Sequence, residues 1–314
     1  MSKRSASKPK QAQDGPNPRQ RCPCGSGRRF KACHGAPGGP IEIPLARPFH
    51  GLAGECELVA LREFVPSAVV ELPLSQPFDV PVTLGTVLPG AAAALVRTDG
   101  SVLVGLQTQL HSNDVSSDVA ASIQWARTAA TGDVLSVPAQ RHDADLPALR
   151  ELIDAEAALI PTLYPDFGWW IPEGVEASGE VAMSLERANA AIMPTERLSS
   201  VQAAYWVDAG ERAHLRWVRP EGEDALLAAL ARLQVRGELD LGEGSRFAGS
   251  FRAHGLLVPV WDLDNESHPR EWEDPAAKLD ERLSVALAEL AESSPTEAEL
   301  RARDGLRGRQ ITLR

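Results

Sequence analysis

Four residues near the start of the chain carry side chains that bind metal ions: Cys22, Cys24, Cys33 and His34. They offer three thiolates and one imidazole within thirteen positions, which is the ligand set of a closed Cys₃His zinc site. Because such a site takes four protein ligands in a tetrahedron, it leaves no position for a substrate. The spacing therefore predicts one structural Zn²⁺ ion and not a catalytic one.

The residues between these ligands suit a chain that reverses around a small ion. Pro23 restricts the backbone between the first two cysteines, and Gly25 and Gly27 permit the positive φ angles of a tight turn. The alternatives are a redox pair, a disulfide or unconnected thiols. A disulfide between Cys22 and Cys24 would close a very small, strained ring, so metal binding is the favoured interpretation.

Three basic residues, Arg28, Arg29 and Lys31, lie in the loop between the two pairs of ligands. Their positive charge favours the deprotonated thiolates that bind zinc. They are also candidate contacts for a binding partner.

The run Cys-Pro-Cys-Gly-Ser-Gly, two basic residues, an aromatic residue, Lys, any residue, Cys-His-Gly resembles the SEC-C motif, over about fifteen residues of this chain. That motif is best known from the C-terminal tail of the preprotein translocase ATPase SecA. In the family it binds zinc and serves as a small docking element, which in SecA docks onto the chaperone SecB or the ribosome. By position, the resemblance implies zinc ligation by Cys22, Cys24, Cys33 and His34.

Three differences separate this chain from SecA. The motif is N-terminal here, and Gln20-Arg21 replace the Asp-Pro that often precedes the first cysteine. The chain also has no G-x-x-x-x-G-K-[ST] phosphate loop, so it is not a SecA ATPase. The layout, with the motif ahead of a long body, resembles an uncharacterised bacterial family whose main domain has no assigned function.

The net charge of −11 conceals two regions of opposite sign. Residues 1–38 hold nine basic residues and one acidic residue, a charge of +8, whereas the rest of the chain carries −19. A basic arm on an acidic body is typical of a tail that contacts nucleic acid, a ribosome or an anionic membrane. The alternative is a solvated tail without a partner.

No segment is apolar enough for a membrane span, and the N-terminus lacks the apolar core of a signal peptide. We therefore expect a cytoplasmic, reducing location. The fourth cysteine, Cys56, lies in an apolar stretch and is expected to be a buried hydrophobic residue.

The chain divides into five predicted regions: a disordered basic tail (1–20), the zinc knuckle (21–36), a Gly- and Pro-rich linker (37–40), an α+β body of unknown function (41–292) and a C-terminal short helix and tail (293–314). In the first half of the body we expect strands at 69–74, 93–96 and 102–106, the last two joined by a hairpin turn at Asp99-Gly100, and helices at 117–130 and 146–160.

The second half is expected to repeat this order, with a hairpin of strands 201–207 and 214–218 and a helix from 224 to 235 that ends at Gly237. An edge strand is expected at 255–261, because Pro259 cannot donate to a neighbour. Helix 275–292 is predicted from a leucine stripe, with Asp274 as its cap. The fold class is therefore α+β, with mixed or antiparallel sheets covered by helices and two strand-strand-helix halves that could be related.

Two groups in the body suggest catalysis or ligand binding. His142, Asp143 and Asp145 could bind a metal, although an N-cap is the simpler interpretation. The residues Arg252, His254, Asp262 and Asp264 flank one strand and could converge at a sheet end.

The aromatic pairs Trp169-Trp170 and Tyr205-Trp206, together with Trp217, could line a groove, although packing is the commoner role of such residues.

The leading hypothesis is a zinc-binding adaptor that docks through its knuckle and basic arm to the ribosome or secretion machinery. The alternatives are an enzyme whose site is in the body, with the knuckle as a targeting tag, and direct RNA binding by the arm.

Overall fold

The computed structural model describes residue 29 and residues 46–138, 146–172, 174–309 and 311. Within Pro44–Arg314, which forms one compact unit, the chain builds two β-sheets with helices on their faces. The predicted α+β class is therefore confirmed. No helix in the described ranges is long and apolar enough to cross a membrane.

The first sheet is mixed and has the strand order β5-β3-β4-β2-β1-β6. Only β2 and β4 run parallel, and the other neighbouring pairs are antiparallel. The elements of this half are α1 (Glu55–Glu63), β1 (Ala68–Glu71), β2 (Val82–Gly85), η2 (Pro89–Ala91), β3 (Ala94–Val96), β4 (Val102–Gly105), α2 (Val115–Ala126), β5 (Val134–Leu135), α3 (Leu149–Leu152), β6 (Thr162–Leu163), η3 (Gly168–Trp170) and α4 (Gly179–Asn189).

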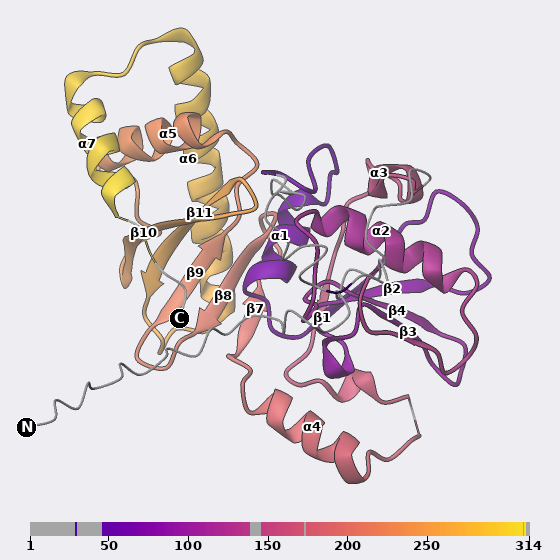
Figure 1. The fold of residues 1–314 in the computed structure, drawn as a ribbon. Helices are drawn as coiled ribbons and strands as arrows, with labels where there is room; N and C mark the ends of the chain where they lie inside the picture. Colours follow the sequence, from indigo (N-terminus) through magenta and orange to yellow (C-terminus); the bar gives the residue numbers. More distant parts are fainter. Residues whose placement is uncertain (1–28, 30–45, 139–145, 173, 310, 312–314) are drawn as a thin grey trace, which may run out of the picture. The chain divides into compact units, whose positions relative to one another are not determined.

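Both faces of the first sheet are covered. Helix α2 lies along one face (Figure 1), and its Val119 and Ile123 pack with Val82 and Val104 of the sheet in the main apolar core. On the other face Leu103 of β4 packs in a smaller cluster with Leu88 and Trp169. This explains why all four residues of β4 are buried, since a strand covered on both faces has no polar side.

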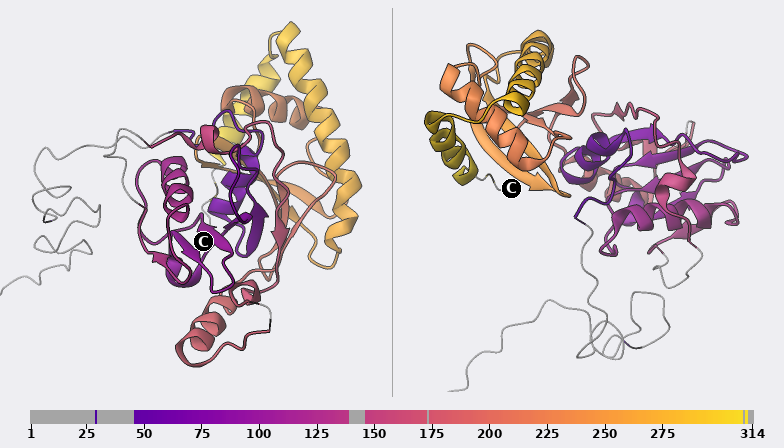
Figure 2. Two further views of the ribbon diagram at one scale, coloured as in Figure 1. Left: turned by 90° about the vertical axis from the view of Figure 1, so that its right-hand side faces the viewer. Right: turned by 90° about the horizontal axis from the view of Figure 1, so that it is seen from above.

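The second sheet is antiparallel throughout, with the order β10-β11-β9-β8-β7. Its helices α5 and α6 cover one face (Figure 2) and bury leucines against Trp217 and Trp261. The elements are β7 (Thr195–Arg197), β8 (Ala204–Asp208), β9 (Ala213–Trp217), α5 (Glu223–Arg236), β10 (Ser245–Ala253), β11 (Leu256–Leu263), η4 (Pro269–Trp272), α6 (Glu273–Glu292) and α7 (Glu297–Gly308).

Helix α1 joins the two halves through a buried carboxylate. Glu57 is fully buried and accepts hydrogen bonds from Arg197 of β7 (Nη2 to Oε1, 2.7 Å) and from the hydroxyl of Tyr205 on β8. The backbone N–H of Ala203 donates to the same carboxylate at 3.1 Å. Because a buried charge is stable only when it is paired, this cluster fixes the position of β7 relative to α1.

Several local predictions are confirmed. Strands β3 and β4 form the expected hairpin across Asp99-Gly100, and β8 and β9 form the second one. The helix expected at 117–130 also forms, although it spans Val115–Ala126 and the Asp114 side chain caps its start. Helix α5 ends at Gly237, which has the left-handed φ of 71° that glycine adopts without strain. A short C-terminal helix, α7, also forms.

The helix expected over 146–160 is wrong, since only Leu149–Leu152 is helical. After this turn Ile153 pairs with Leu74 in a β-bridge, and Asp154 N donates to Pro73 O at 2.7 Å. Tertiary pairing thus overrides the helical pattern of this segment. Ile160, expected on the buried face, is 72% exposed.

The edge position of the strand containing Pro259 is also wrong, because β11 lies between β10 and β9. Ser250, the partner of Pro259 on β10, directs its own N–H and C=O to Arg309 and Ile311. In an antiparallel ladder Pro259 then faces β9, whose pairing with β11 stops at Val260. Proline has no backbone N–H to donate, and at position 259 this absence falls where the pairing of β11 with β9 ends.

Asp274 is not the cap of α6, whose N-cap is Trp272. The short helix η4, which has its own capping box of His268 and Glu271, runs directly into α6 and places Asp274 in the first turn. The leucine stripe of this helix is confirmed, with Leu279 and Leu283 fully buried.

Both strand-strand-helix units form, as β3-β4-α2 and β8-β9-α5. Their sheets differ, because β4 has the parallel neighbour β2 whereas β9 has the antiparallel neighbour β11. The expected relation between two halves therefore does not extend to their sheet topology.

Candidate functional site

The predicted zinc ligands Cys22, Cys24, Cys33 and His34 lie outside the described residues, as do Arg28 and Lys31. Arg29, the remaining candidate partner contact, is exposed. The donor set itself, three thiols and one imidazole, fits zinc in its chemistry. The assignment of these ligands stays a prediction from the sequence.

Within the described ranges, no group of three or more His, Cys, Asp or Glu side chains is arranged to hold a metal ion. Cys56 is buried in the core, as the sequence predicted. Burial, assisted by the nearby carboxylate of Glu55, raises the pKa of its thiol to about 12. A thiol that is protonated and buried is a poor nucleophile, so Cys56 acts as a small apolar residue.

The residues that flank strand β11 do not converge. His254 lies at the turn between β10 and β11, and its Nε2 is 2.9 Å from Oε1 of Glu63 on α1. Asp262 lies near the far end of β11, paired with His214 of β9. Arg252 instead forms an ion pair with Glu223 at 2.5 Å. The expected combination of His254 and Asp262 is therefore not assembled.

Asp262 belongs to a cluster on one face of the second sheet. Arg246 donates to its carboxylate at 2.7 Å and Arg212 at 3.2 Å. His214 Nδ1 is 3.2 Å from the other oxygen, a close contact without the alignment of a hydrogen bond. Burial lowers the pKa of His214, and the Asp262 carboxylate opposes that effect.

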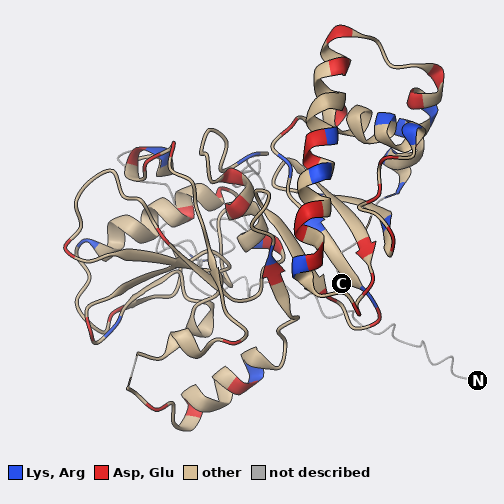
Figure 3. Ribbon diagram, turned by 180° about the vertical axis from the view of Figure 1, so that it is seen from behind, with Lys and Arg blue, Asp and Glu red and all other residues tan. Residues whose placement is uncertain are grey.

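The Asp262 cluster borders an open hollow of about 420 Å³ that is lined mostly by charged residues. Asp264, at its rim, accepts a hydrogen bond from the backbone N–H of Glu266 in a turn. Two guanidinium groups, those of Arg212 and Arg246, already contact the Asp262 carboxylate. The contacts are those of a structural ion-pair network, and opposite charges alternate over the helices of this half as well (Figure 3).

The predicted group of His142, Asp143 and Asp145 lies outside the described residues. Its interpretation as a helix cap or a metal site therefore stays a prediction.

Trp169 and Trp170 pack against the first sheet. The indole N–H of Trp169 donates to Ser67 Oγ at 2.9 Å, and that of Trp170 donates to Val87 O at 2.8 Å. Phe167 stacks on Trp170 with a centroid distance of 4.6 Å. Since both indoles have acceptors within the protein, this aromatic pair serves packing, the commoner of the two roles considered.

Trp206 differs from its neighbour Tyr205 and from Trp217. Tyr205 and Trp217 are fully buried, whereas Trp206 is 8% exposed and lines a hollow of about 450 Å³ between β6 and β7. We call this hollow the edge groove. It is lined by Pro66, Ser67, Pro161, Leu163, Tyr164, Pro165, Ile192, Met193, Pro194, Thr195, Glu196, Arg197 and Trp206.

Sequence reasoning missed the edge groove because its lining comes from distant segments. One signal was present, since Pro161 and Pro165 bracket the apolar Leu163 and Tyr164, and proline limits a strand to an edge. Helix α4, which lies between the groove segments in sequence, has no buried residue. It stands apart from both sheets in Figure 1.

Comparison with known families adds two matches. Residues 19–36 match the SEC-C motif, which confirms the resemblance drawn from the cysteine spacing. Residues 48–314 match a family described as a family of unknown function, DUF5926. The chain belongs to the DUF5926 family. Searches of curated proteins and of solved structures found no match.

The DUF5926 match begins close to the start of the compact unit at Pro44 and includes α7. The edge groove and the Asp262 cluster both lie inside it, whereas the predicted zinc ligands lie inside the SEC-C match. The sequence expectation of a SEC-C motif ahead of a main domain without an assigned function is therefore confirmed.

Proposed function

We propose that this chain is a zinc-binding adaptor protein that docks through its SEC-C knuckle and basic arm to a larger partner. The observation that carries the proposal is the SEC-C match over residues 19–36, which contains all four predicted zinc ligands. Cys22, Cys24, Cys33 and His34 would hold one Zn²⁺ ion. The ion would stabilise the fold of a segment too short to build an apolar core.

The charge distribution supports docking by this end of the chain. Residues 1–38 carry +8 and the remainder −19, so an anionic partner would be attracted to the arm and repelled by the body. A ribosome or a component of the secretion machinery fits this description, and both imply a cytoplasmic protein. Arg28, Arg29 and Lys31 would lie beside the metal and contribute to the contact.

The first test is the zinc content of the full-length protein. We expect one zinc ion per chain in the unmodified protein and none in the Cys22→Ser/Cys24→Ser variant. His111→Ala, which removes an exposed imidazole outside the motif, should keep its zinc. Full zinc content in the double cysteine variant would disprove the ligand assignment.

The second test concerns the partner. A pull-down from cell lysate with the protein in which all four ligands are replaced should lose the partners that the unmodified protein retains. If every partner remains, the knuckle is not the docking element. Affinity that falls steeply with salt, and capture of RNA in place of protein, would instead support direct RNA binding by the arm.

A further inference from the structure

The edge groove presents one carboxylate whose charge is not balanced. Glu196 and Arg197 are the charged residues of its lining. Arg197 donates two hydrogen bonds to Glu57 Oε1, at 2.7 and 3.0 Å, so its charge is already paired. Glu196 is exposed, and among the described residues its carboxylate has no ion pair. The groove therefore attracts positive charge.

The carboxylate of Glu196 lies beside an indole. In the pairing of β7 with β8, Glu196 is opposite Trp206, and Arg197 is opposite Tyr205. Residues directly opposite each other share a face of the sheet, with Cβ atoms about 4.5–5.5 Å apart. Trp206 and Tyr205 belong to apolar clusters on the two different faces. Glu196 and Trp206 thus share one face, and Arg197 lies on the other.

The β6 side of the groove adds an accessible aromatic ring and an apolar wall. Strands β6 and β7 lie side by side, and their flanking residues Leu163, Tyr164 and Met193 all line the hollow. Tyr164 is 37% exposed, whereas Trp206 is 8% exposed, so the phenol ring offers most of the accessible aromatic surface. A cation placed against such a ring is attracted by the negative charge density of its face.

The polar groups of the lining restrict which cation fits. The Ser67 hydroxyl already donates to Asp166 O, and the Thr195 hydroxyl already donates to Met193 O. A primary ammonium carries three N–H groups that each need an acceptor, whereas a quaternary ammonium carries none. An apolar hollow with one free carboxylate therefore favours an alkylated ammonium. The volume of about 450 Å³ is that of a small-molecule site.

We propose that the edge groove binds a small organic cation, an alkylated ammonium compound whose charge lies between Glu196 and the ring of Tyr164. Glu196 supplies the opposite charge, Tyr164 the aromatic face, and Leu163 and Met193 the contacts for the alkyl groups. This site is separate from the zinc knuckle and does not depend on the function proposed above.

The test uses the full-length protein and two probes of the same shape. Choline carries a trimethylammonium group, and its neutral analogue has a carbon atom in place of the nitrogen. Titrations followed by saturation-transfer NMR use the sharp methyl signal of each probe. The unmodified protein should bind choline saturably and about tenfold more tightly than the neutral analogue, because only choline is attracted by the carboxylate and the ring.

The decisive variant is Glu196→Gln, which keeps the shape of the side chain and removes its charge. The affinity for choline should fall about threefold, and the affinity for the neutral analogue should not change. Glu281→Gln makes the same change at an exposed position of α6 and should leave both affinities as they are.

A second pair of variants tests the aromatic ring. Tyr164→Leu keeps an apolar surface and removes the ring, and it should weaken choline binding about threefold. Tyr164→Phe keeps the ring and should retain the affinity for choline. Circular dichroism verifies that each variant is folded.

The proposal fails if choline does not bind the unmodified protein saturably, or if it binds no more tightly than its neutral analogue. It also fails if Glu196→Gln leaves the preference for choline unchanged. A folded Glu196→Gln protein that loses both probes equally would contradict it as well, because shape and not charge would then govern binding.

Discussion

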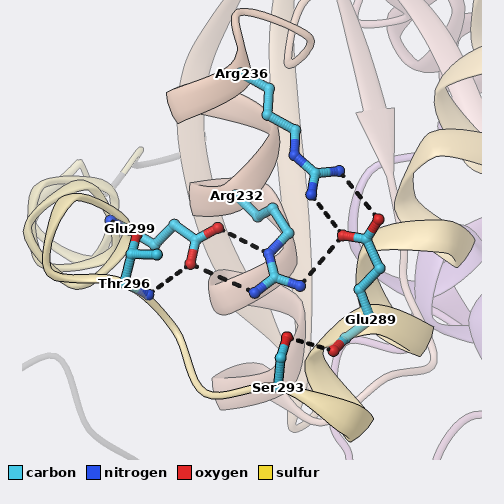
Figure 4. Close-up of polar contacts among 6 residues, drawn as sticks. All are labelled: Arg232, Arg236, Glu289, Ser293, Thr296 and Glu299. Atoms are coloured by element: carbon cyan, nitrogen blue, oxygen red, sulfur yellow. Dashed lines mark hydrogen bonds and ion pairs between the residues drawn. The ribbon is translucent and has the colours of Figure 1, made fainter.

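Arg232 of α5 donates a hydrogen bond from Nε to Oε1 of Glu299 on α7 at 2.8 Å, and both residues are almost completely buried. The same guanidinium contacts Glu289 of α6 at 3.3 Å (Figure 4). Glu299 also accepts a hydrogen bond from Thr296 N at 2.7 Å, which caps α7. One buried cation thus connects the three helices of the second half.

Replacing Arg232 should therefore destabilise the protein strongly. Arg232→Met leaves Glu299 buried without its partner, and we expect a loss of about 3 kcal/mol in the free energy of unfolding. Arg236→Met removes the exposed ion pair between Arg236 and Glu289 and should lower the free energy of unfolding by less than about 1 kcal/mol. Urea titrations of both variants, followed by circular dichroism, measure the difference.

A double variant separates the charge from the packing. If Arg232→Met destabilises because a carboxylate is left unpaired, Arg232→Met/Glu299→Gln should be more stable than Arg232→Met alone. Equal stabilities would show that the loss comes from the packing of the arginine stem and not from the ion pair.

The same pair predicts a dependence of stability on pH. The hydrogen bond from Arg232 holds the pKa of Glu299 below its ordinary value of 4.5, so the folded state favours the ionised form. Its contribution is present above the unfolded pKa and is lost as the pH falls through the folded pKa. The stability difference between the unmodified protein and Glu299→Gln should thus shrink when urea titrations at pH 7 are repeated below pH 4.5. A difference that stays constant would contradict the role of the charge.

Glu57 should be as sensitive as Arg232, since it joins α1 to the second sheet. Glu57→Gln leaves the guanidinium of Arg197, whose side chain is 18% exposed, without its anion and should lower the free energy of unfolding by about 3 kcal/mol. Burial and the neighbouring Glu57 carboxylate hold the pKa of Tyr205 well above its ordinary value, so this hydroxyl stays protonated and donates. Tyr205→Phe removes the hydroxyl that donates to Glu57 and should lower the free energy of unfolding by about 1–2 kcal/mol.

Glu71→Gln on the exposed side of β1 is the matched control for Glu57→Gln, and it should have no measurable effect on urea unfolding. If Glu57→Gln behaves like this control, the carboxylate does not hold the two halves together.

Local signals explain which elements the sequence predicts. The hairpin at Asp99-Gly100 and the end of α5 at Gly237 depend on turn residues that need no distant partner. Helix α1 was missed because seven consecutive residues from Glu55 to Leu61 are buried, so no polar face marks its period. From the sequence alone, the charged side chains of Glu55 and Glu57 would be expected at the surface. In the fold they are paired with Arg47 and Arg197.

The predicted and observed sites differ for the same reason. The predicted zinc ligands lie within thirteen positions, so their assignment needs only the spacing of the sequence. The edge groove instead combines Ser67, Leu163 and Trp206, which only the fold brings together. The His254 hypothesis failed because the sequence gives no sign of Glu63, its partner 191 positions away.

Gly85 of β2 lies against Trp169, and this contact predicts the effect of a single methyl group. A Cβ at position 85 would lie 2.6 Å from Cη2 of the indole, closer than packed atoms approach. Gly85→Ala should therefore lower the free energy of unfolding by about 1–3 kcal/mol. Adding Trp169→Leu should recover part of this loss in urea titrations, because the clash is with a side chain.

Gly105 of β4 provides the contrast to Gly85. There a Cβ would lie 2.4 Å from the backbone oxygen of Ala92. Trimming the neighbouring side chain with Leu88→Ala should not rescue Gly105→Ala. If both glycine variants are rescued equally well, the distinction between a side-chain and a backbone contact is wrong.

Removal of zinc should have different effects on the knuckle and on the body. The described residues hold no group suited to a metal ion, and the body has its own apolar cores around α1, α2, α5 and α6. A chelator should therefore strip the zinc while the midpoint of urea unfolding, followed by tryptophan fluorescence, stays unchanged. All seven tryptophans follow residue 120, so this signal reports on the body alone. A midpoint that falls with the chelator, and recovers when zinc is restored, would show that the metal also stabilises the DUF5926 region.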